Sequence, residues 1–349
     1  MPFAAMQSAL EEAGRISQIV EANHVMRIRM AQPGAVPEFL IDETYWRTYD
    51  YCAAVVRLYA CFERFLIEAT DYWINWISAY DISILSGAVK TVERYRYGVG
   101  EILRRATEPR FSKVNVVDLV ESLAALHDGK QRAKLQVDAF YAGLPNLRLG
   151  DVNKVLEVVR LGSAEAWLAT YRPLTEHCDL TGTSAETLLA DLVERRNEAA
   201  HGNELPAEIL GVQPLKDAAA FISLFVTAVA ELIATRTMQV LQADPAINAI
   251  SRLGVVTERF KKHAACVIKT DENPIWIGMP VLLISNSRCY VETIKSIQVD
   301  GVPKGCVVPD LAEEIGLGFG KAPEEGMTVY RIDVIPQLLS SGFVGAGLS

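Results

Sequence analysis

The sequence lacks the features of a secreted protein. It has only six cysteines, none of them in a CxxC pair, which argues against a disulfide framework. We therefore expect reduced, mostly buried thiols in a cytoplasmic protein. A zinc site built from Cys266, Cys289 and Cys306 is the alternative, although their spacings are wide. The N-terminal residues carry acids early and have no basic region, so we expect no signal peptide.

Long uncharged runs and an excess of positive charge are also missing. The most apolar stretch, Asp217–Thr237, has about 13 uncharged residues before Glu231, whereas a membrane span needs ~20. We interpret it as a buried helix, and a membrane span is the alternative. The formal net charge of −9 excludes binding of nucleic acid through bulk charge, so any phosphate binding must come from a local patch.

What the sequence does contain is two regions of different periodicity. Helical patterns predict helices over residues 6–30, 44–79, 86–107, 114–125, 150–161, 184–202 and 215–242. After about Leu253, short β-branched runs alternate with turn signals at Glu272–Pro274, Ser285–Ser287 and Asp300–Gly301. The predicted fold is therefore multi-domain, with an all-α helical bundle over residues 1–250 and a small all-β domain over residues 260–337.

The stretch ERRNEAAHGN, residues 194–203, ends a predicted helix that Ser184 caps and Gly202 terminates. Arg196 and His201 lie five positions apart. One interpretation is an ordinary helix end, where a histidine is favourable against the helix macrodipole. The other is a phosphate-handling site, because Asn197 adds a third polar group and the helix lies between two strongly apolar helices.

These residue types are sufficient for cleaving RNA without a metal or another cofactor. A histidine can take the proton from a ribose 2′-OH or give one to the leaving 5′-oxygen. An arginine fork can hold the phosphate and stabilise the charge of the transition state. DNA has no 2′-OH and should resist. Arg196 and His201 are the candidate catalytic pair, and Asn197 can orient the histidine or the phosphate.

The spacing raises a geometric difficulty. Five residues at about 100° each separate Arg196 and His201 by roughly 140° around an ideal helix. Either the last turn unwinds near His201, or a phosphate is held between the motifs of two subunits. The second option suits a symmetric homodimer, and the long predicted helix over residues 44–79, apolar on several faces, is typical of a bundle interior or a subunit interface.

The motif RRNEAAHG resembles that of the HEPN superfamily, whose members carry Arg-x4–6-His in a helical bundle, and in particular its RiboL-PSP-type ribonucleases. The segments 57–74 and 147–162 are also similar in order and spacing, so the resemblance covers roughly residues 40–245. It implies a dimeric endoribonuclease of toxin or phage-defence type that leaves 2′,3′-cyclic phosphate and 5′-OH ends. It also implies Arg196 and His201 as the catalytic pair, Asn197 as a polar accessory and Glu63 as a supporting acid. A partly buried acid paired with Arg64 is the alternative for Glu63.

The second region resembles domain 2 of elongation factor Tu. The segments IWIGMPVLLI, VETIKSIQVDGVP and AEEIGLGFGKAPEEGMTVYRI follow in the order of that domain's strands and hairpins. The resemblance implies a small β-barrel over residues 260–337, which can select the substrate or receive a regulatory partner such as an antitoxin. A small SH3-like barrel that packs on the bundle is the alternative.

Three functions are therefore compatible with the sequence. The first is a metal-independent endoribonuclease acting on RNA, for example tRNA or mRNA. The second is a non-catalytic HEPN-type module that binds RNA or a nucleotide, and the third is an adaptor that acts through the barrel. Basic runs with Arg94, Arg96 and Tyr95, Tyr97, and then Arg104, Arg105, Arg110 and Lys113, can line an RNA path or form an ordinary solvated helix face.

Overall fold

The computed structural model describes residues 2–30, 42–111, 114–129, 134–201, 209–243, 250–286 and 288–332. About eleven helices come first in these residues, and an eight-stranded antiparallel sheet follows. The chain divides into two compact units, Pro2–Val229 and Ala230–Ser349, and the division falls inside a helix, α11 (Val212–Ala243). The coarse prediction of an all-α region followed by an all-β region is confirmed.

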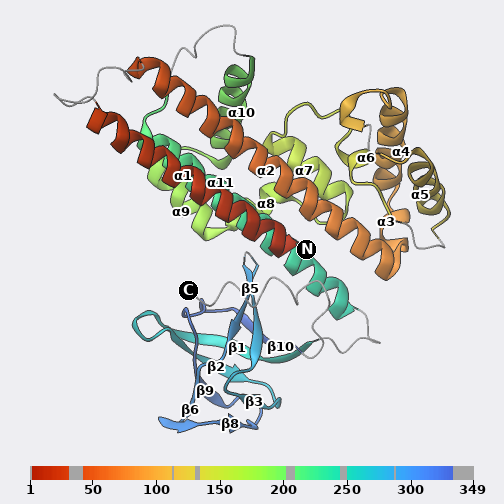
Figure 1. Ribbon diagram of the computed structural model, residues 1–349. Coiled ribbons are helices and arrows are strands. Elements are labelled where there is room, and N and C mark those ends of the chain that lie inside the picture. The colour runs from red at the N-terminus through yellow and green to blue at the C-terminus, as the bar shows by residue number, and fades with distance from the viewer. Residues whose placement is uncertain are drawn as a thin grey trace. The chain divides into compact units, whose positions relative to one another are not determined.

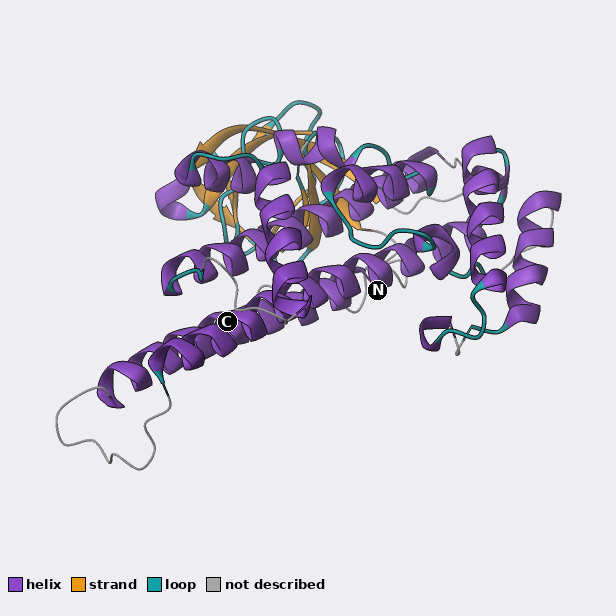
Figure 2. Ribbon diagram, turned by 90° about the horizontal axis from the view of Figure 1, so that it is seen from above, coloured by secondary structure: helices purple, strands orange, loops and turns teal. Residues whose placement is uncertain are grey.

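The helical unit is built around two long antiparallel helices, α1 (Pro2–Met30) and α2 (Glu43–Asp81), which lie side by side (Figure 1, Figure 2). Asp42 caps α2 by accepting from the backbone N–H of Thr44 at 2.7 Å. Arg27 forms a buried ion pair with Asp50 across the two helices. The remaining helices are α3 (Ser83–Ser86), α4 (Val89–Arg104), α5 (Val116–Asp128), α6 (Asp138–Tyr141), α7 (Leu149–Val158), α8 (Ala164–Thr170), α9 (Arg172–Thr181), α10 (Ala185–His201) and α11.

Helix α2 forms the centre of this unit. Its fully buried aromatic side chains include Tyr59, Phe62, Phe65 and Trp73, and it packs against both α1 and α10. The indole N–H of Trp73 donates to the carbonyl oxygen of Val159 at 2.7 Å, so the buried polar atom is satisfied. The prediction that this helix is buried on more than one side is confirmed, and part of that burial lies in the interior of the bundle.

Helix α11 is long and strongly apolar. By length and composition alone it is the one helix in the described residues that could cross a membrane, with a mean hydropathy of 2.0 over an 18-residue window. Within the protein, 72% of that window is buried. This burial favours the interpretation as a core helix, which is how the sequence was interpreted.

The sheet unit has strand order β5-β4-β10-β1-β2-β9-β6-β7, and a separate pair joins β3 to β8. The Asp300–Gly301 turn joins β6 to β7 with both residues at positive φ, 50° and 76°, as a two-residue hairpin turn requires. The strands are β1 (Ile250–Phe260), β2 (Ala265–Thr270), β3 (Ile275–Trp276), β4 (Pro280–Ile284), β5 (Cys289–Thr293), β6 (Ser296–Val299), β7 (Val302–Lys304), β8 (Cys306–Val307), β9 (Glu314–Gly318) and β10 (Thr328–Ile332). Strand β1 thus begins ten residues before the domain start expected at residue 260.

The prediction of a barrel is wrong, because the sheet does not close. Its two edge strands, β5 and β7, do not pair with each other in the described residues. Strand β7 is three residues long, exposed throughout, and carries Pro303, which has no N–H to donate. On the other edge, the backbone N–H of Cys289 donates to a carboxylate oxygen of Glu231 at 2.9 Å. This backbone donor of β5 is therefore bound by a side chain of α11 and cannot pair with another strand.

One apolar core nevertheless serves the whole sheet. It includes Leu253 of β1, Leu283 of β4, Ile297 of β6 and Leu317 of β9, all essentially inaccessible to solvent. Two irregularities in the register of β1 bend this central strand. At Gly254 a Cβ atom would lie 2.3 Å from the carbonyl oxygen of Lys269, so only glycine fits the bend. The sheet therefore curves around its core without forming a closed ladder.

A buried ion pair joins the second half of α11 to this sheet. Nε of Arg288 lies 2.9 Å from Oε2 of Glu231, and Nη2 lies 3.3 Å from Oε1. The two side chains are 11% and 5% exposed. Together with the bond from Cys289, the Glu231 carboxylate accepts three hydrogen bonds, which is what a buried charge requires.

Candidate functional site

Helix α10 carries the motif that the sequence singles out. Ser184 caps its N-terminus, since its hydroxyl accepts from the backbone N–H of Thr187 at 3.1 Å, as predicted. The backbone is helical from Ala185 to His201. Gly202, the predicted terminator, lies outside the described residues. The helix therefore does not unwind before His201.

The guanidinium of Arg196 is held from three directions. Its Cζ lies 4.7 Å from the centre of the Tyr59 ring on α2. Its Nη1 donates to the side-chain oxygen of Asn146 at 3.1 Å and to that of Asn197 at 3.0 Å. The side chain is half-buried. Such contacts fix the orientation of a long side chain before a ligand arrives, which reduces the entropy lost on binding.

The other edge of the guanidinium is not engaged by any of the described residues. Among the described residues, Nε and Nη2 of Arg196 have no hydrogen bond or ion pair. Two adjacent N–H donors on a planar fork match the geometry of two phosphate oxygens. Arg196 therefore presents a fixed, partly exposed donor edge that can hold a phosphate.

Tyr59 and Asn146 complete this cluster. The hydroxyl of Tyr59, itself buried, accepts from the backbone N–H of Leu147 at 2.9 Å. The segment before α7 is thereby fixed to α2, and Asn146 is held next to Arg196. Neither residue was identified from the sequence as part of the site. The sequence did offer one signal for Tyr59. It lies one helical turn before Glu63, a predicted site residue, so the two share a face of the helix.

Two other predicted site residues, Asn197 and His201, lie on the same helix as Arg196. Asn197 lies directly against Arg196 through the bond given above, so these two are brought together. The backbone of His201 is in the last turn of α10, but its side chain lies outside the described residues. An ideal helix points the two Cβ atoms at positions 196 and 201 roughly 140° apart.

Glu63 is half-buried and lies near Tyr141 rather than in contact with Arg196. Its charge, added to the larger effect of burial, raises the pKa of the Tyr141 hydroxyl. No ion pair of Glu63 with Arg64 is present in the described part of the chain, and Arg64 is exposed. Glu63 is thus one turn beyond Tyr59 on the same helix, at the margin of the cluster.

The expected RNA path along the basic runs is not supported at two of its residues. Tyr95 is fully buried, and its hydroxyl accepts from the backbone N–H of Gln136. Arg94 donates to the carbonyl oxygens of Phe140 and Ala142, so it supports the fold and does not face solvent as a free charge. Tyr97 remains 54% exposed.

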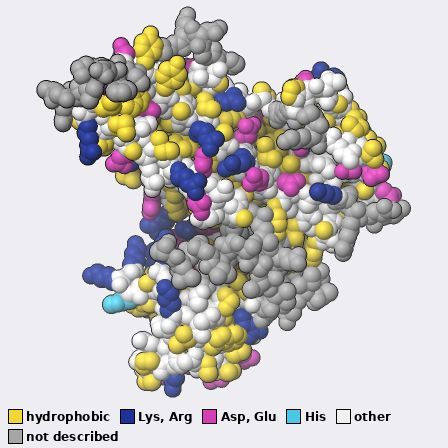
Figure 3. All heavy atoms as spheres, in the orientation of Figure 1, with side chains coloured by type: hydrophobic (Ala, Val, Ile, Leu, Met, Phe, Trp, Pro, Cys, Tyr) yellow, Lys and Arg dark blue, Asp and Glu magenta, His cyan; other side chains and the backbone are white. Residues whose placement is uncertain are grey.

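Later in the same region, Arg104 pairs with Glu101 and Arg105 with Glu108. The side chain of Arg110, and Lys113 altogether, lie outside the described residues. On the face drawn in Figure 3, basic and acidic side chains are interspersed over the helical unit and do not form a basic stripe. The solvated-face interpretation fits these helices better than a phosphate-binding track does.

The six cysteines are all free thiols. Cys61, Cys266 and Cys289 are buried, Cys52 and Cys178 are half-buried, and Cys306 is exposed. Within the described residues no group of three or more His, Cys, Asp or Glu side chains is placed to hold a metal ion, which gives no support to a zinc site.

No protein-family model and no curated protein sequence matches this chain. The arrangement around Arg196 is therefore the basis on which a function can be assigned.

Proposed function

We propose that this chain is a metal-independent endoribonuclease of the HEPN type that cleaves RNA to 2′,3′-cyclic phosphate and 5′-OH ends. The observation that carries the proposal is the guanidinium of Arg196, which is fixed by Tyr59, Asn146 and Asn197 while its Nε and Nη2 edge has no partner among the described residues. A binding site for the scissile phosphate needs such a preorganised donor pair.

The chemistry follows from the residue types. A neutral His201 side chain removes the proton of the ribose 2′-OH, and the 2′-oxygen attacks the adjacent phosphorus. The bond from phosphorus to the 5′-oxygen breaks, and a protonated histidine gives that oxygen its proton. Arg196 balances the additional negative charge that the phosphate carries in the transition state. The 2′-oxygen is the nucleophile, so DNA is not a substrate.

Helix geometry supports a dimeric site. Because the backbone of α10 is helical through His201, positions 196 and 201 of one chain lie roughly 140° apart around an ideal helix. In a two-fold dimer, Arg196 of one subunit can face His201 of the other across a shared phosphate.

A mixing experiment tests the shared site. Arg196→Ala and His201→Ala are each expected to be inactive. In a heterodimer of the two variants, one site combines both substitutions and the other combines both natural residues. An equimolar, fully exchanged mixture should then recover about a quarter of the natural activity. A mixture that stays inactive despite proven subunit exchange rejects the shared site.

The same arrangement favours one alternative. If the two motifs do not meet, Arg196, whose Nε and Nη2 have no partner in the described part of the chain, still suits binding of a phosphate without cleavage. The chain would then be an RNA- or nucleotide-binding module. Filter binding at two salt concentrations distinguishes the cases: a binding module holds uncut RNA that Arg196→Ala releases, while an enzyme yields fragments. His127→Ala, an exposed histidine on α5, is the matched control for His201→Ala.

A further inference from the structure

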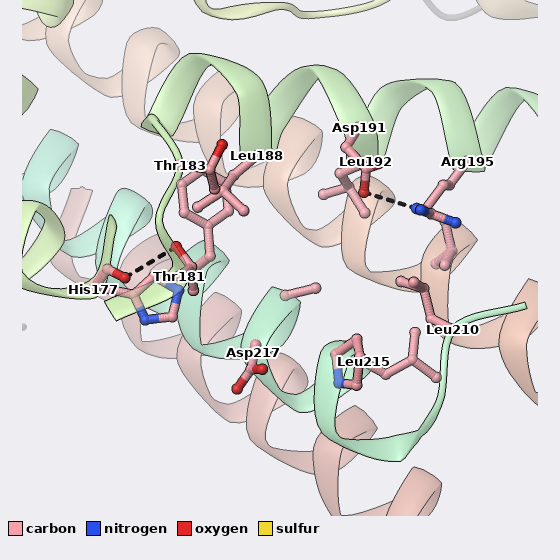
Figure 4. A pocket seen from close by; sticks show the side chains of 14 residues that line it. His177, Thr181, Thr183, Leu188, Asp191, Leu192, Arg195, Leu210, Leu215 and Asp217 are labelled. Carbon is pink, nitrogen blue, oxygen red and sulfur yellow. Dashed lines mark hydrogen bonds and ion pairs between the residues drawn. The ribbon is translucent and has the colours of Figure 1, made fainter. Parts of the chain in front are cut away.

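A cavity lies in the helical unit, between α9, α10 and the first turns of α11 (Figure 4). Its volume is about 220 Å³. Apolar walls come from side chains such as Leu188, Leu192 and Phe221, and polar groups come from His177, Thr181, Thr183, Asp191, Arg195 and Asp217. A concave, largely apolar space with a few polar groups is the usual form of a small-molecule site.

His177 gives this cavity an unused hydrogen-bonding atom. Its Nε2 is buried and has no hydrogen-bond partner in the described residues. The ring stacks on Phe221, with centroids 6.4 Å apart and planes 25° from parallel. A buried polar atom without a partner costs free energy, and proteins retain such atoms mainly where they serve a function. A ligand in the cavity that bonds to Nε2 removes this cost.

The charges in the lining select the kind of ligand. Arg195 is paired with Asp191, 2.8 Å away, and also donates to the hydroxyl of Tyr51. Asp217 accepts only from the side-chain amide of Gln213, at 2.8 Å, within the described part of the chain. Two carboxylates against one guanidinium disfavour a phosphate inside the cavity. They favour a neutral ligand that presents N–H donors to a carboxylate.

The volume points to a ring system of two fused rings. An apolar cavity of about 150 Å³ holds benzene, so the larger space here suits a bicyclic ring. Guanine is neutral, flat and of that size. Its N1–H and N2–H donors lie side by side and match both oxygens of one carboxylate, while its ring nitrogens accept hydrogen bonds.

We propose that this cavity binds a guanine base, with Asp217 accepting from the N1–H and N2–H edge and Nε2 of His177 bonding to another ring position. Any phosphate attached to the ligand lies outside the cavity. The base can belong to a free nucleotide or to a strand of RNA, and the chemistry in the cavity is the same. The site is separate from the Arg196 cluster and does not depend on cleavage.

Calorimetry on the full chain tests the proposal without any measurement of cleavage. Guanosine 5′-monophosphate should bind one-to-one with a Kd below about 1 mM. Adenosine 5′-monophosphate and uridine 5′-monophosphate should bind at least about 10-fold more weakly, because neither presents the paired donors. To separate the two sources, the titrant is replaced by the uncleavable deoxyoligonucleotide TTGTTT. Tighter binding of this strand than of the mononucleotide identifies a strand, and weaker binding identifies a free nucleotide.

Two variants separate ligand binding from packing. Asp217→Asn should weaken binding of guanosine 5′-monophosphate about 10-fold or more. His177→Phe keeps the ring stacked on Phe221 and removes only the polar atom, so it should raise or preserve the Tm while weakening binding about 5-fold. His127→Phe, at an exposed position on α5, should change neither.

The negative results are equally defined. No binding of guanosine 5′-monophosphate and none of the deoxyoligonucleotide up to about 1 mM overturns the proposal. So does binding that both Asp217→Asn and His177→Phe leave unchanged. If His177→Phe fails to fold, the Asp217→Asn titration alone decides. An active ribonuclease that binds no guanine would refute this site and leave the proposed function intact.

Discussion

Replacing Arg196 with alanine should remove most of the RNA cleavage at a small cost in stability. The stacking on Tyr59 is worth about 0.5–1 kcal/mol at a half-exposed position. The bond to Asn146 adds about 1 kcal/mol, while the bond to the neighbouring Asn197 orders little additional structure. The free energy of unfolding should therefore fall by about 1–2 kcal/mol. For a unit of this size that lowers the Tm by roughly 2–8 °C.

The effect on catalysis should be much larger. Loss of a preorganised donor to a transition-state oxyanion costs about 100- to 1,000-fold in rate. The assay measures cleavage of a labelled single-stranded RNA at 20 °C, next to a thermal melt of the same sample. Arg196→Lys keeps the charge but loses the planar fork, so its rate should lie between those of the natural chain and Arg196→Ala. Arg104→Ala, which removes an exposed i,i+3 ion pair, is the matched control and should change neither quantity.

Two outcomes would refute this reasoning. Full activity of Arg196→Ala removes the arginine from the site. A loss of more than about 4 kcal/mol in stability, beyond the sum of its contacts, shows instead that Arg196 is needed for the fold and that its loss of activity carries no chemical information.

Three further predictions concern the framework. Glu231→Ala removes the carboxylate of a buried ion pair and leaves the guanidinium of Arg288 buried, so hydrogen exchange of the sheet peptides should show a loss of about 3–5 kcal/mol; protection equal to the natural chain would contradict this. Gly98→Ala places a Cβ 1.8 Å from a carbonyl oxygen of α6, so a melt should show a loss of about 3 kcal/mol or more, and an unchanged Tm would show that the helices can separate. Thiol labelling at pH 8 should modify the exposed Cys306 first. Cys266 should react only on unfolding, because burial raises its pKa to about 12 and leaves little thiolate; equal rates would refute its burial.

Periodicity predicted the longer helices and missed four short ones, α3, α6, α8 and α9, of which α9 had partial signals. Helix α9 begins with Pro173 in its first turn and ends at Gly182, whose φ is 68°; both are ordinary helix punctuation. In ERYRYG, the RNA-path interpretation required Tyr95 and Tyr97 to face the same side. Residues two positions apart on a helix face opposite sides, so Tyr95 and Tyr97 were never able to share one surface.

The contacts of the site required the tertiary structure. Tyr59 and Asn146 are distant from Arg196 in sequence, and nothing in the local pattern indicates that they meet its guanidinium. The strand pattern likewise could not predict whether the sheet closes, because closure depends on whether the two edge strands pair. The Ser184 cap, by contrast, is set by neighbouring residues and was predicted correctly.

The boundary between the two units also changes how a truncation should be designed. A cut near Leu253 falls inside β1, the strand that pairs with both β2 and β10. The second half of α11 belongs to the same compact unit as the sheet. Removing the sheet there would expose apolar side chains of α11, so substitutions are a cleaner means of separating the two units than deletion is.

The most direct test of the proposed function is cleavage of RNA by the purified full chain in EDTA, followed by analysis of the cut ends. The account predicts fragments with 2′,3′-cyclic phosphate and 5′-OH ends, no cleavage of the DNA of the same sequence, and no fragments from His201→Ala. Fragments that require a divalent metal, that carry 5′-phosphate ends, or that persist in His201→Ala would contradict it.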